Sequence, residues 1–148
     1  MTRLDTQGLF ILKDNDIIPY EITDSKIILV GVPGAFTPGC TNKHLPGFAK
    51  NIVPLHNKGV KKIVFMSVND AFVMDAWNKL HGSKLWGSDD IDCVSDPLAV
   101  FSKRIKEDVD WGETFGVRCN RFAYLIENRE IIKKFKDPFI EGVLKELW

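Results

Sequence analysis

Two stretches of the chain are almost uninterrupted in hydrophobic residues, at positions 27–33 (IILVGVP) and 63–68 (IVFMSV). Strands that are covered on both faces of a sheet show such runs, whereas half-exposed strands alternate hydrophobic with polar residues. We therefore predict two central, buried strands, the first over 27–33 and the second over 61–68.

Shorter patterns predict further elements on either side of these runs. Strands at 10–12 and 17–22, joined by a polar turn, would form a small hairpin, in which Pro19 favours an edge position. Asn69-Asp70 is a helix N-cap signal. The remaining predicted elements are helices at 41–59 (kinked near 45–47), 71–80, 97–105 and 138–148, a strand at 91–95, an exposed loop at 107–116, and a hairpin of 121–126 with 131–135.

This order of elements, with strands and helices alternating through the middle of the chain, predicts an α/β domain over residues 1–148. The central sheet should be mixed, with helices on both faces and the added N-terminal hairpin at one edge.

Composition and charge narrow the function. The 148 residues are 45% hydrophobic and 27% charged, which is ordinary for a globular domain with a real core. The 20 basic and 20 acidic residues balance, which gives no support for a nucleic-acid or membrane surface. No apolar run approaches the roughly 20 residues of a membrane helix. The N-terminus also lacks the hydrophobic segment of a signal peptide.

The three cysteines, Cys40, Cys93 and Cys119, form neither a disulfide framework nor a Cys-x-x-Cys pair. An odd count at wide spacing suits a reducing compartment and one working thiol. We therefore expect a cytoplasmic protein, or one of an organelle matrix if a transit peptide has been removed.

Cys40 lies where the first buried strand turns into a helix. Unpaired N–H groups and the positive end of the helix dipole favour a thiolate there. A buried structural cysteine is the alternative. Two glycines and two prolines within residues 33–39, and the hydroxyl of Thr37 three positions before the sulfur, favour a reactive thiol in a stiff turn.

Other side chains near this turn leave alternatives open. His44, one helical turn beyond Cys40, could form a nucleophilic Cys–His pair, but a structural or hydrogen-bonding role is favoured because the sequence shows no Asn or Asp to orient it. His56 and His81 are expected at the surface. We expect no bound metal, since no two candidate ligands have a recognised spacing. Four aromatic residues are expected in the core or, near the turn, at a substrate mouth or dimer contact: Phe36, Phe72, Trp77 and Trp86.

The fold and the turn together are thioredoxin-like. In thioredoxins a Cys-x-x-Cys opens the helix after a buried strand, and the equivalent stretch here is Thr37-Pro-Gly-Cys40. A hydroxyl has replaced the first sulfur, so dithiol exchange within this motif is impossible.

The segment Pro33-x-x-x-Thr37-x-x-Cys40 resembles the signature of the peroxiredoxins, and residues 32–48 resemble their type II, peroxiredoxin-five-like branch. The resemblance runs from about residue 8 to 140. Two further segments match: Ser67-Val-Asn-Asp-Ala-Phe-Val73 and Arg118-x-x-Arg121-Phe122.

What the resemblance implies is a cofactor-free thiol peroxidase that reduces hydrogen peroxide and organic hydroperoxides. Cys40 would be the peroxidatic nucleophile, oxidised to a sulfenic acid. Thr37 would hydrogen-bond the peroxide, Arg121 would stabilise the thiolate and the developing charge, and Pro33 would shield the sulfur. Arg118 would act from further out. The branch also suggests a homodimer joined near the nucleophile loops.

Two other functions compete with this one. A redox-sensing or partner-binding protein could keep the thioredoxin fold, but an intact Thr37, Cys40 and Arg121 favours the enzyme. A thiol-disulfide oxidoreductase is disfavoured by the missing second cysteine.

The sulfenic acid needs a resolving thiol. Some members of this branch carry a resolving cysteine in the strand before Ser67 or near the C-terminus, and this chain has neither. Cys93 is expected to be buried filler, and nothing in the motif gives Cys119 a redox task. We therefore expect a one-cysteine mechanism that uses an external thiol: glutathione, glutaredoxin or thioredoxin.

Overall fold

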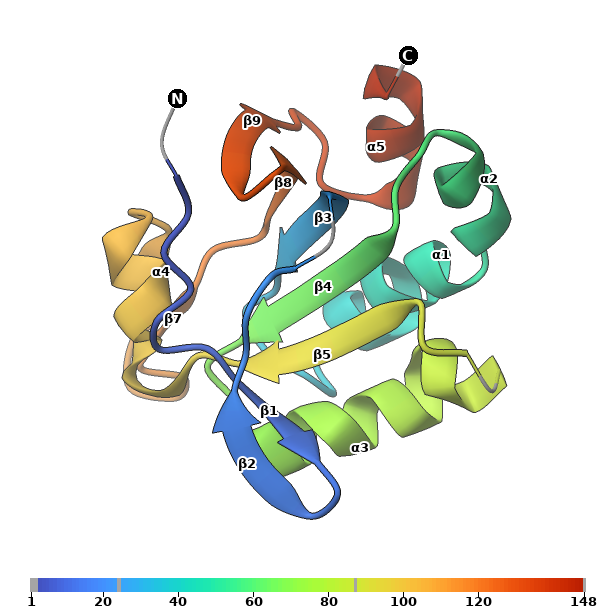
Figure 1. Cartoon of the computed structure of the whole chain (residues 1–148). Coiled ribbons are helices and arrows are strands. Elements are labelled where there is room, and N and C mark those ends of the chain that lie inside the picture. Colours follow the sequence, from blue (N-terminus) through green and yellow to red (C-terminus); the bar gives the residue numbers. More distant parts are fainter. Residues whose placement is uncertain (1–2, 24, 87, 148) are drawn as a thin grey trace.

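A seven-stranded sheet in the order β2-β1-β5-β4-β3-β8-β9 runs through the computed structural model, which describes residues 3–23, 25–86 and 88–147 except the side chains of Lys84 and Trp86 (Figure 1). Its strands are β1 (Phe10–Lys13), β2 (Asp16–Pro19), β3 (Lys26–Gly31), β4 (Lys62–Ser67), β5 (Ile91–Ser95), β8 (Phe122–Glu127) and β9 (Glu130–Lys134).

The sheet is mixed, as predicted. β3, β4 and β5 are parallel neighbours, while β8 runs antiparallel to β3. The N-terminal hairpin β1–β2 joins one edge by an antiparallel contact with β5, and β9 closes the other edge. The two predicted central strands are the most deeply buried, because β3 and β4 have neighbours on both sides and are covered on both faces.

Helices cover both faces. The helical elements are η1 (Cys40–His44), α1 (Leu45–Ala49), α2 (Ile52–Asn57), α3 (Ala71–His81), η2 (Ser83–Trp86), η3 (Pro97–Ala99), α4 (Val100–Arg104) and α5 (Ile140–Glu146). One hydrophobic core packs under α1, α2, α3 and α5, and a second packs under α4 and the N-terminal segment. Figure 1 shows α4 beside that segment, away from α1, α2 and α5. No described helix is both long and hydrophobic enough to cross a membrane.

The helix predicted over 41–59 is three separate pieces. It starts as the π-helical turn η1, in which the N–H of Leu45 donates to the carbonyl of Cys40, five residues earlier. Pro46 follows at once and has no N–H, so it cannot make the backbone hydrogen bond that an α-helix would need there. The chain forms the wider π-helical turn instead. A second break, not predicted, lies at Asn51, whose backbone leaves the helical region and whose side chain donates to Gly47 O (2.7 Å).

Other boundaries also differ from the prediction. The helix expected over 97–105 begins with a 3₁₀ turn, because Leu98 and Ala99 are left-handed and regular helix starts only at Val100. The region 107–116, expected as a loop, holds strand β6 (Asp108–Asp110), which pairs with β7 (Val117–Cys119). The closing helix begins at Ile140 rather than at Pro138.

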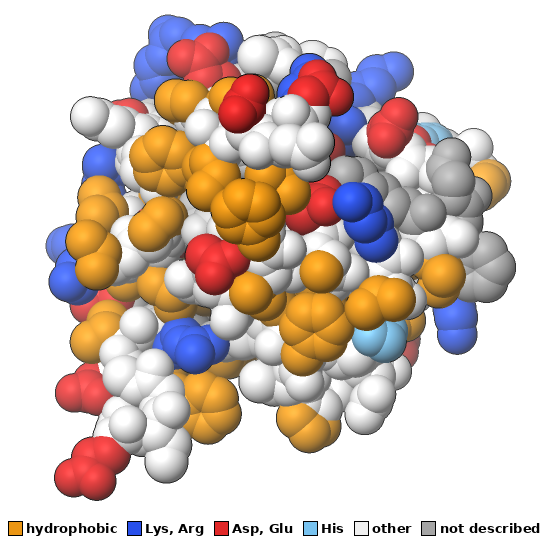
Figure 2. Space-filling model, turned by 90° about the horizontal axis from the view of Figure 1, so that it is seen from below, with side chains coloured by type: hydrophobic (Ala, Val, Ile, Leu, Met, Phe, Trp, Pro, Cys, Tyr) orange, Lys and Arg blue, Asp and Glu red, His pale blue; other side chains and the backbone are white. Residues whose placement is uncertain are grey.

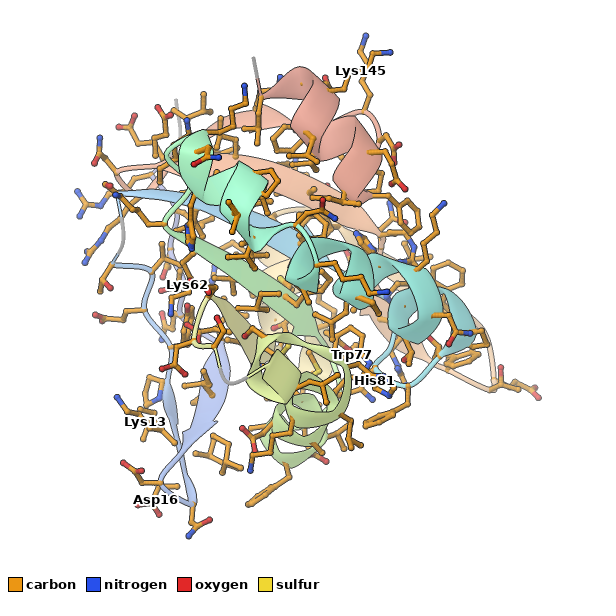
Figure 3. The ribbon with its side chains drawn as sticks, turned by 90° about the vertical axis from the view of Figure 1, so that its right-hand side faces the viewer. Lys13, Asp16, Lys62, Trp77, His81 and Lys145 are labelled. Carbon is orange, nitrogen blue, oxygen red and sulfur yellow. The ribbon has the colours of Figure 1, made fainter. Side chains whose placement is uncertain are left out.

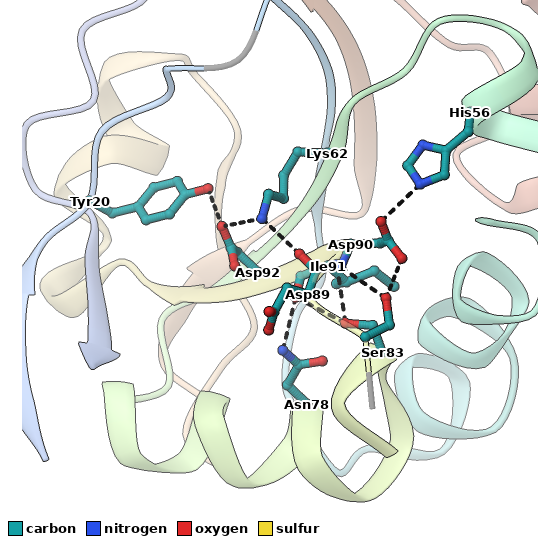
Figure 4. Close-up of polar contacts among 10 residues, drawn as sticks. Tyr20, His56, Lys62, Asn78, Ser83, Asp89, Asp90, Ile91 and Asp92 are labelled. Atoms are coloured by element: carbon teal, nitrogen blue, oxygen red, sulfur yellow. Dashed lines mark hydrogen bonds and ion pairs between the residues drawn. The ribbon is translucent and has the colours of Figure 1, made fainter. Parts of the chain in front are cut away.

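A polar network ties the start of β5 to its surroundings (Figure 4). Tyr20 Oη donates to Asp92 Oδ2 (2.7 Å), where Lys62 also lies 3.6 Å away. His56 Nε2 contacts Asp90 Oδ1 (2.8 Å). This cluster lies where the parallel strands begin, the end opposite to Cys40. No three described His, Cys, Asp or Glu side chains gather as metal ligands, here or elsewhere.

Candidate active site

Cys40 is the first residue of η1 and follows a tight turn, residues 33–39, that we call the nucleophile turn. The Cys40 side chain is fully buried, yet Pro38 and Gly39 directly before it are exposed, so the sulfur lies just below the surface. Within the turn, Thr37 Oγ1 donates to Gly34 O (2.6 Å), and the N–H of Thr41 donates to Thr37 O (2.9 Å).

The guanidinium of Arg121, the residue directly before β8, reaches the sulfur of Cys40. Its Nη2 lies 3.1 Å from Cys40 Sγ, although the two residues are 81 positions apart. The sheet explains this meeting, because Gly31 at the end of β3 pairs with Phe122 at the start of β8. A side chain at Gly31 would collide with the Phe122 ring, so glycine permits the close approach.

His44 holds the same guanidinium. Arg121 Nη1 donates to His44 Nδ1 (2.6 Å), and His44 Nε2 contacts the backbone carbonyl of Pro138 (2.8 Å). A carbonyl can only accept, so Nε2 carries the proton and Nδ1 is the acceptor. Both ring nitrogens are thereby engaged away from Cys40, and the hydrogen-bonding interpretation of His44 is confirmed.

The charge state of His44 agrees with these contacts. Burial lowers the pKa of His44 to about 4; the Pro138 hydrogen bond raises it in part, and the positive charge of Arg121 lowers it further. The imidazole is therefore neutral at physiological pH and accepts from Arg121 without charge repulsion. The Phe139 ring packs against the His44 ring (4.4 Å between centroids) and lies 5.1 Å from Arg121 Cζ.

Arg118 forms a hydrogen bond with the backbone of the nucleophile turn. Its Nη1 donates to Pro33 O (3.0 Å), and its Nε donates to Phe115 O (3.2 Å). Pro33 is half-buried. A Cβ on Gly34 would lie 2.8 Å from Arg118 Nη1, so a side chain there would displace the end of this arginine. Arg118 thus contacts the backbone of the turn, whereas Arg121 contacts the sulfur.

Aromatic residues near the turn divide between core and surface. Trp77 on α3 is fully buried and donates through Nε1 to Thr41 Oγ1 (2.9 Å), which confirms its core position. Figure 3 shows Trp77 and His81 on α3 beside the segment that begins with Cys40. Phe36 and Phe72 are about half exposed, so the core is excluded for them and the alternative of a substrate mouth or dimer contact stays a prediction. The side chain of Trp86 lies outside the described residues.

The other two cysteines are buried on opposite faces of the sheet. Cys93 lies on β5 in the core under α3, and Cys119 belongs to the core under α4. Cys119 Sγ donates to Val32 O (3.0 Å). Burial, with a smaller contribution from Asp96, raises the pKa of the Cys119 thiol far above its usual range. Cys119 is therefore a poor nucleophile where it lies.

Comparison with known proteins agrees with this geometry. The Redoxin family model matches residues 10–147. Peroxiredoxin-2C from Oryza sativa subsp. japonica is 40% identical over 107 residues, which are 72% of this chain and 64% of the relative. The chain belongs to the peroxiredoxins. It falls in their type II, peroxiredoxin-five-like branch.

Solved peroxiredoxin structures share its fold. Reduced Prx3 from Vibrio vulnificus in complex with H₂O₂ has a TM-score of 0.89 at 30% identity, covering 99% of this chain and 97% of that one. Peroxiredoxin 5 from Alvinella pompejana has a TM-score of 0.78 at 26% identity, covering 98% and 95%. The thioredoxin-like fold is confirmed. The chain spans slightly under two thirds of the rice relative's length.

Of the predicted site residues of this peroxiredoxin, Cys40 and Arg121 are in contact, and Thr37 lies in the turn directly before Cys40. Pro33 lies at the start of that turn. Sequence reasoning missed the Pro138 carbonyl and the Phe139 ring, because a backbone acceptor 94 positions from His44 leaves no side-chain signal. It also assigned Asn69 to a helix cap, whereas Asp70 alone caps α3 by accepting from the N–H of Val73.

The buried neutral His44 predicts a specific loss of stability in acid. Between pH 6.5 and about 4 the unfolded chain binds a proton at His44 that the native state does not, so the free energy of unfolding falls as pH falls. The full shift is worth on the order of 3 kcal/mol. Urea unfolding at pH 7.0 and 4.5 should show a larger loss in wild type than in His44→Gln, which cannot titrate.

The half-exposed His56 supplies the matched control. The pKa of His56 is raised by its hydrogen bonds to Val60 and Asp90, so it contributes the opposite sign and His56→Gln should keep the fall. Equal pH dependence in wild type and His44→Gln would contradict the buried neutral imidazole.

Proposed function

We propose that this peroxiredoxin is a thiol-dependent peroxidase that reduces hydrogen peroxide and organic hydroperoxides through Cys40. The observation that carries the proposal is the contact of 3.1 Å between Arg121 Nη2 and the buried Cys40 sulfur at a strand-to-helix turn. A fixed positive charge at that distance can stabilise the negative charge that develops as the O–O bond breaks.

In the proposed step, the Cys40 thiolate attacks one peroxide oxygen. An S–O bond forms and the O–O bond breaks, giving a sulfenic acid and a leaving alkoxide or hydroxide that takes up a proton. Sulfur is oxidised by two electrons and the peroxide is reduced by two. A complex of Vibrio vulnificus Prx3 with H₂O₂ supports this substrate class.

Donors around the sulfur must supply most of the acceleration. A free cysteine is about 3% thiolate at neutral pH, so full ionisation raises the concentration of reactive thiolate only about thirtyfold. A thiolate of lower pKa is also a weaker nucleophile, which cancels part of this gain. One preorganised donor can contribute about 3 kcal/mol. Arg121 is such a donor. The proton of Thr37 Oγ1 is directed to Gly34 O, so Thr37 would accept a hydrogen bond from the peroxide.

Hydroperoxide consumption by wild type beside Cys40→Ser tests this function. Wild type with a thiol reductant should consume H₂O₂ and tert-butyl hydroperoxide over many turnovers, and Cys40→Ser should lose this activity. Equal consumption by both proteins, or none by wild type, would contradict the proposal.

The two arginines of the active site should differ in their effects. Arg121→Ala should lower the second-order rate constant for H₂O₂ about a hundredfold, as expected for one charged donor at the reacting atoms. Arg118→Ala is the matched control and should lower it much less, because Arg118 contacts the turn backbone. Stopped-flow kinetics would measure both; a larger effect for Arg118 would exchange their roles.

For resolution of the sulfenic acid, we propose the one-cysteine mechanism with an external thiol. A thiol condenses with the sulfenic acid to a mixed disulfide and water, and a second thiol then releases Cys40. Burial of Cys93 and Cys119, and the raised pKa of Cys119, support a resolving thiol from outside the chain. Glutathione, glutaredoxin and thioredoxin are the candidate donors.

Replacing both remaining cysteines tests this mechanism. Cys93→Ser/Cys119→Ser should retain turnover with an added thiol, since neither sulfur takes part. Mass spectrometry of peroxide-treated wild type should find sulfenic acid or a thiol adduct at Cys40. A stoichiometric bridge from Cys40 to Cys93 or Cys119 would overturn the mechanism.

A homodimer joined near the nucleophile turns is part of the same proposal. Phe36 in this turn and Phe72 near the start of α3 are 47% and 56% exposed, and Figure 2 shows hydrophobic side chains exposed across the face seen from below, some next to a histidine. Phe36 itself packs edge-on against His81 (6.0 Å between centroids). A second copy would cover such a surface. A cytoplasmic or organelle-matrix location stays a prediction.

A further inference from the structure

We propose that Asn69 is a positioning residue that fixes the nucleophile turn and sets the rate of peroxide reduction through Thr37, without touching the substrate. This inference rests on the proposed peroxidase function of Cys40. Its basis is one hydrogen bond, from the N–H of Ala35 to Asn69 Oδ1 (2.9 Å), which ties the middle of the turn to a segment 34 positions away.

The nucleophile turn needs a stabilising contact from outside the turn because its backbone is strained. Phe36 has a φ of 63°, in the left-handed region that costs free energy for every residue except glycine. Such a conformation persists only where surrounding contacts enforce it. The Phe36 side chain is about half exposed, so packing alone does not hold it. Ala35, immediately before Phe36, is where Asn69 holds the chain.

Asn69 is itself fixed at three points. Ser67 Oγ donates to Asn69 Oδ1 (2.5 Å), and the N–H of Asn69 donates to Ser67 Oγ (3.2 Å). Ser95 Oγ donates to the backbone carbonyl of Asn69 (2.6 Å). Ser67 and Ser95 are fully buried and are register partners on β4 and β5. Oδ1 thus accepts two hydrogen bonds and connects the turn after β3 with the end of β4, while the backbone carbonyl of Asn69 is held by the end of β5.

The hydrogen bond between Ala35 and Asn69 affects the position of Thr37 rather than that of the sulfur. Thr37 Oγ1 donates to Gly34 O, the carbonyl of the same peptide group whose N–H, on Ala35, donates to Asn69. Release of Ala35 would therefore let the Gly34 carbonyl and the Thr37 hydroxyl move together. The sulfur of Cys40 has its own contact, with Arg121. A displaced donor or acceptor of about 1 Å can slow a reaction by about a hundredfold.

Two reactions of Cys40 separate positioning from general damage. Alkylation by iodoacetamide needs an accessible thiolate but no oxygen acceptor at Thr37, whereas peroxide reduction needs both. Asn69→Ala should lower the second-order rate constant for H₂O₂ by at least about tenfold while alkylation stays within about twofold across pH 5–9. A merely structural role would lower both rates together.

Conservative replacement gives a second readout. Asn69 Oδ1 acts as an acceptor in both side-chain contacts, and an Asp carboxylate can accept in the same way. In Asn69→Asp, the ratio of the rate constant for H₂O₂ to that for alkylation should therefore return to within about threefold of wild type. Asn78 on α3 offers the matched control, since it is buried and donates to Ile91 O (3.0 Å), away from the turn. Asn78→Ala should lower the melting temperature without a selective loss of peroxide reduction.

The outcomes are distinguishable from failure of the function itself. If wild type does not consume peroxide in a Cys40-dependent way, the proposed function fails. If wild type does, the inference is overturned by an unchanged peroxide rate in Asn69→Ala, by parallel losses in both reactions, or by no rescue in Asn69→Asp. Should Asn69→Ala not fold, Ser67→Ala removes one of the contacts that fix Oδ1 and should give the same selective loss, about threefold or more.

Discussion

The active site depends on the contacts that the guanidinium of Arg121 makes. One of its nitrogens lies 3.1 Å from the Cys40 sulfur, and another donates to His44, which in turn donates to the Pro138 carbonyl. Three segments far apart in the sequence therefore meet here: η1, which carries both Cys40 and His44, the residue before β8, and the segment before α5. Burial keeps His44 neutral, so it can accept from Arg121 instead of repelling it. The guanidinium is therefore fixed in both position and orientation beside the sulfur.

Sheet topology makes this arrangement possible. β3 ends at the nucleophile turn, and β8 begins beside it because the two strands pair antiparallel in the centre of the sheet. β4 and β5 end at the same edge and supply the serines that fix Asn69. The turn that carries Thr37 and the sulfur follows β3, whereas the cation precedes β8 and the residues that fix Asn69 end β4 and β5, so the turn and the cation can be perturbed separately.

Local signals in the sequence predicted the central strands, the mixed sheet and the position of Cys40 at a strand-to-helix turn. Helix boundaries were less predictable, because the break at Asn51 and the left-handed Leu98 and Ala99 depend on packing rather than on local preference. Arg121 was identified through the family resemblance, since nothing local shows which of two arginines reaches the sulfur. The Pro138 carbonyl was not predictable, because every residue carries one.

The central claim is that the Arg121 guanidinium drives the reaction at Cys40, and its hydrogen bond with His44 lets a double-mutant cycle test this most directly. The second-order rate constant for H₂O₂ would be measured for wild type, His44→Gln, Arg121→Ala and the double variant. If His44 only orients the guanidinium, its replacement should slow wild type but should have no further effect once Arg121 is gone. Independent, multiplicative losses in the double variant would contradict the account.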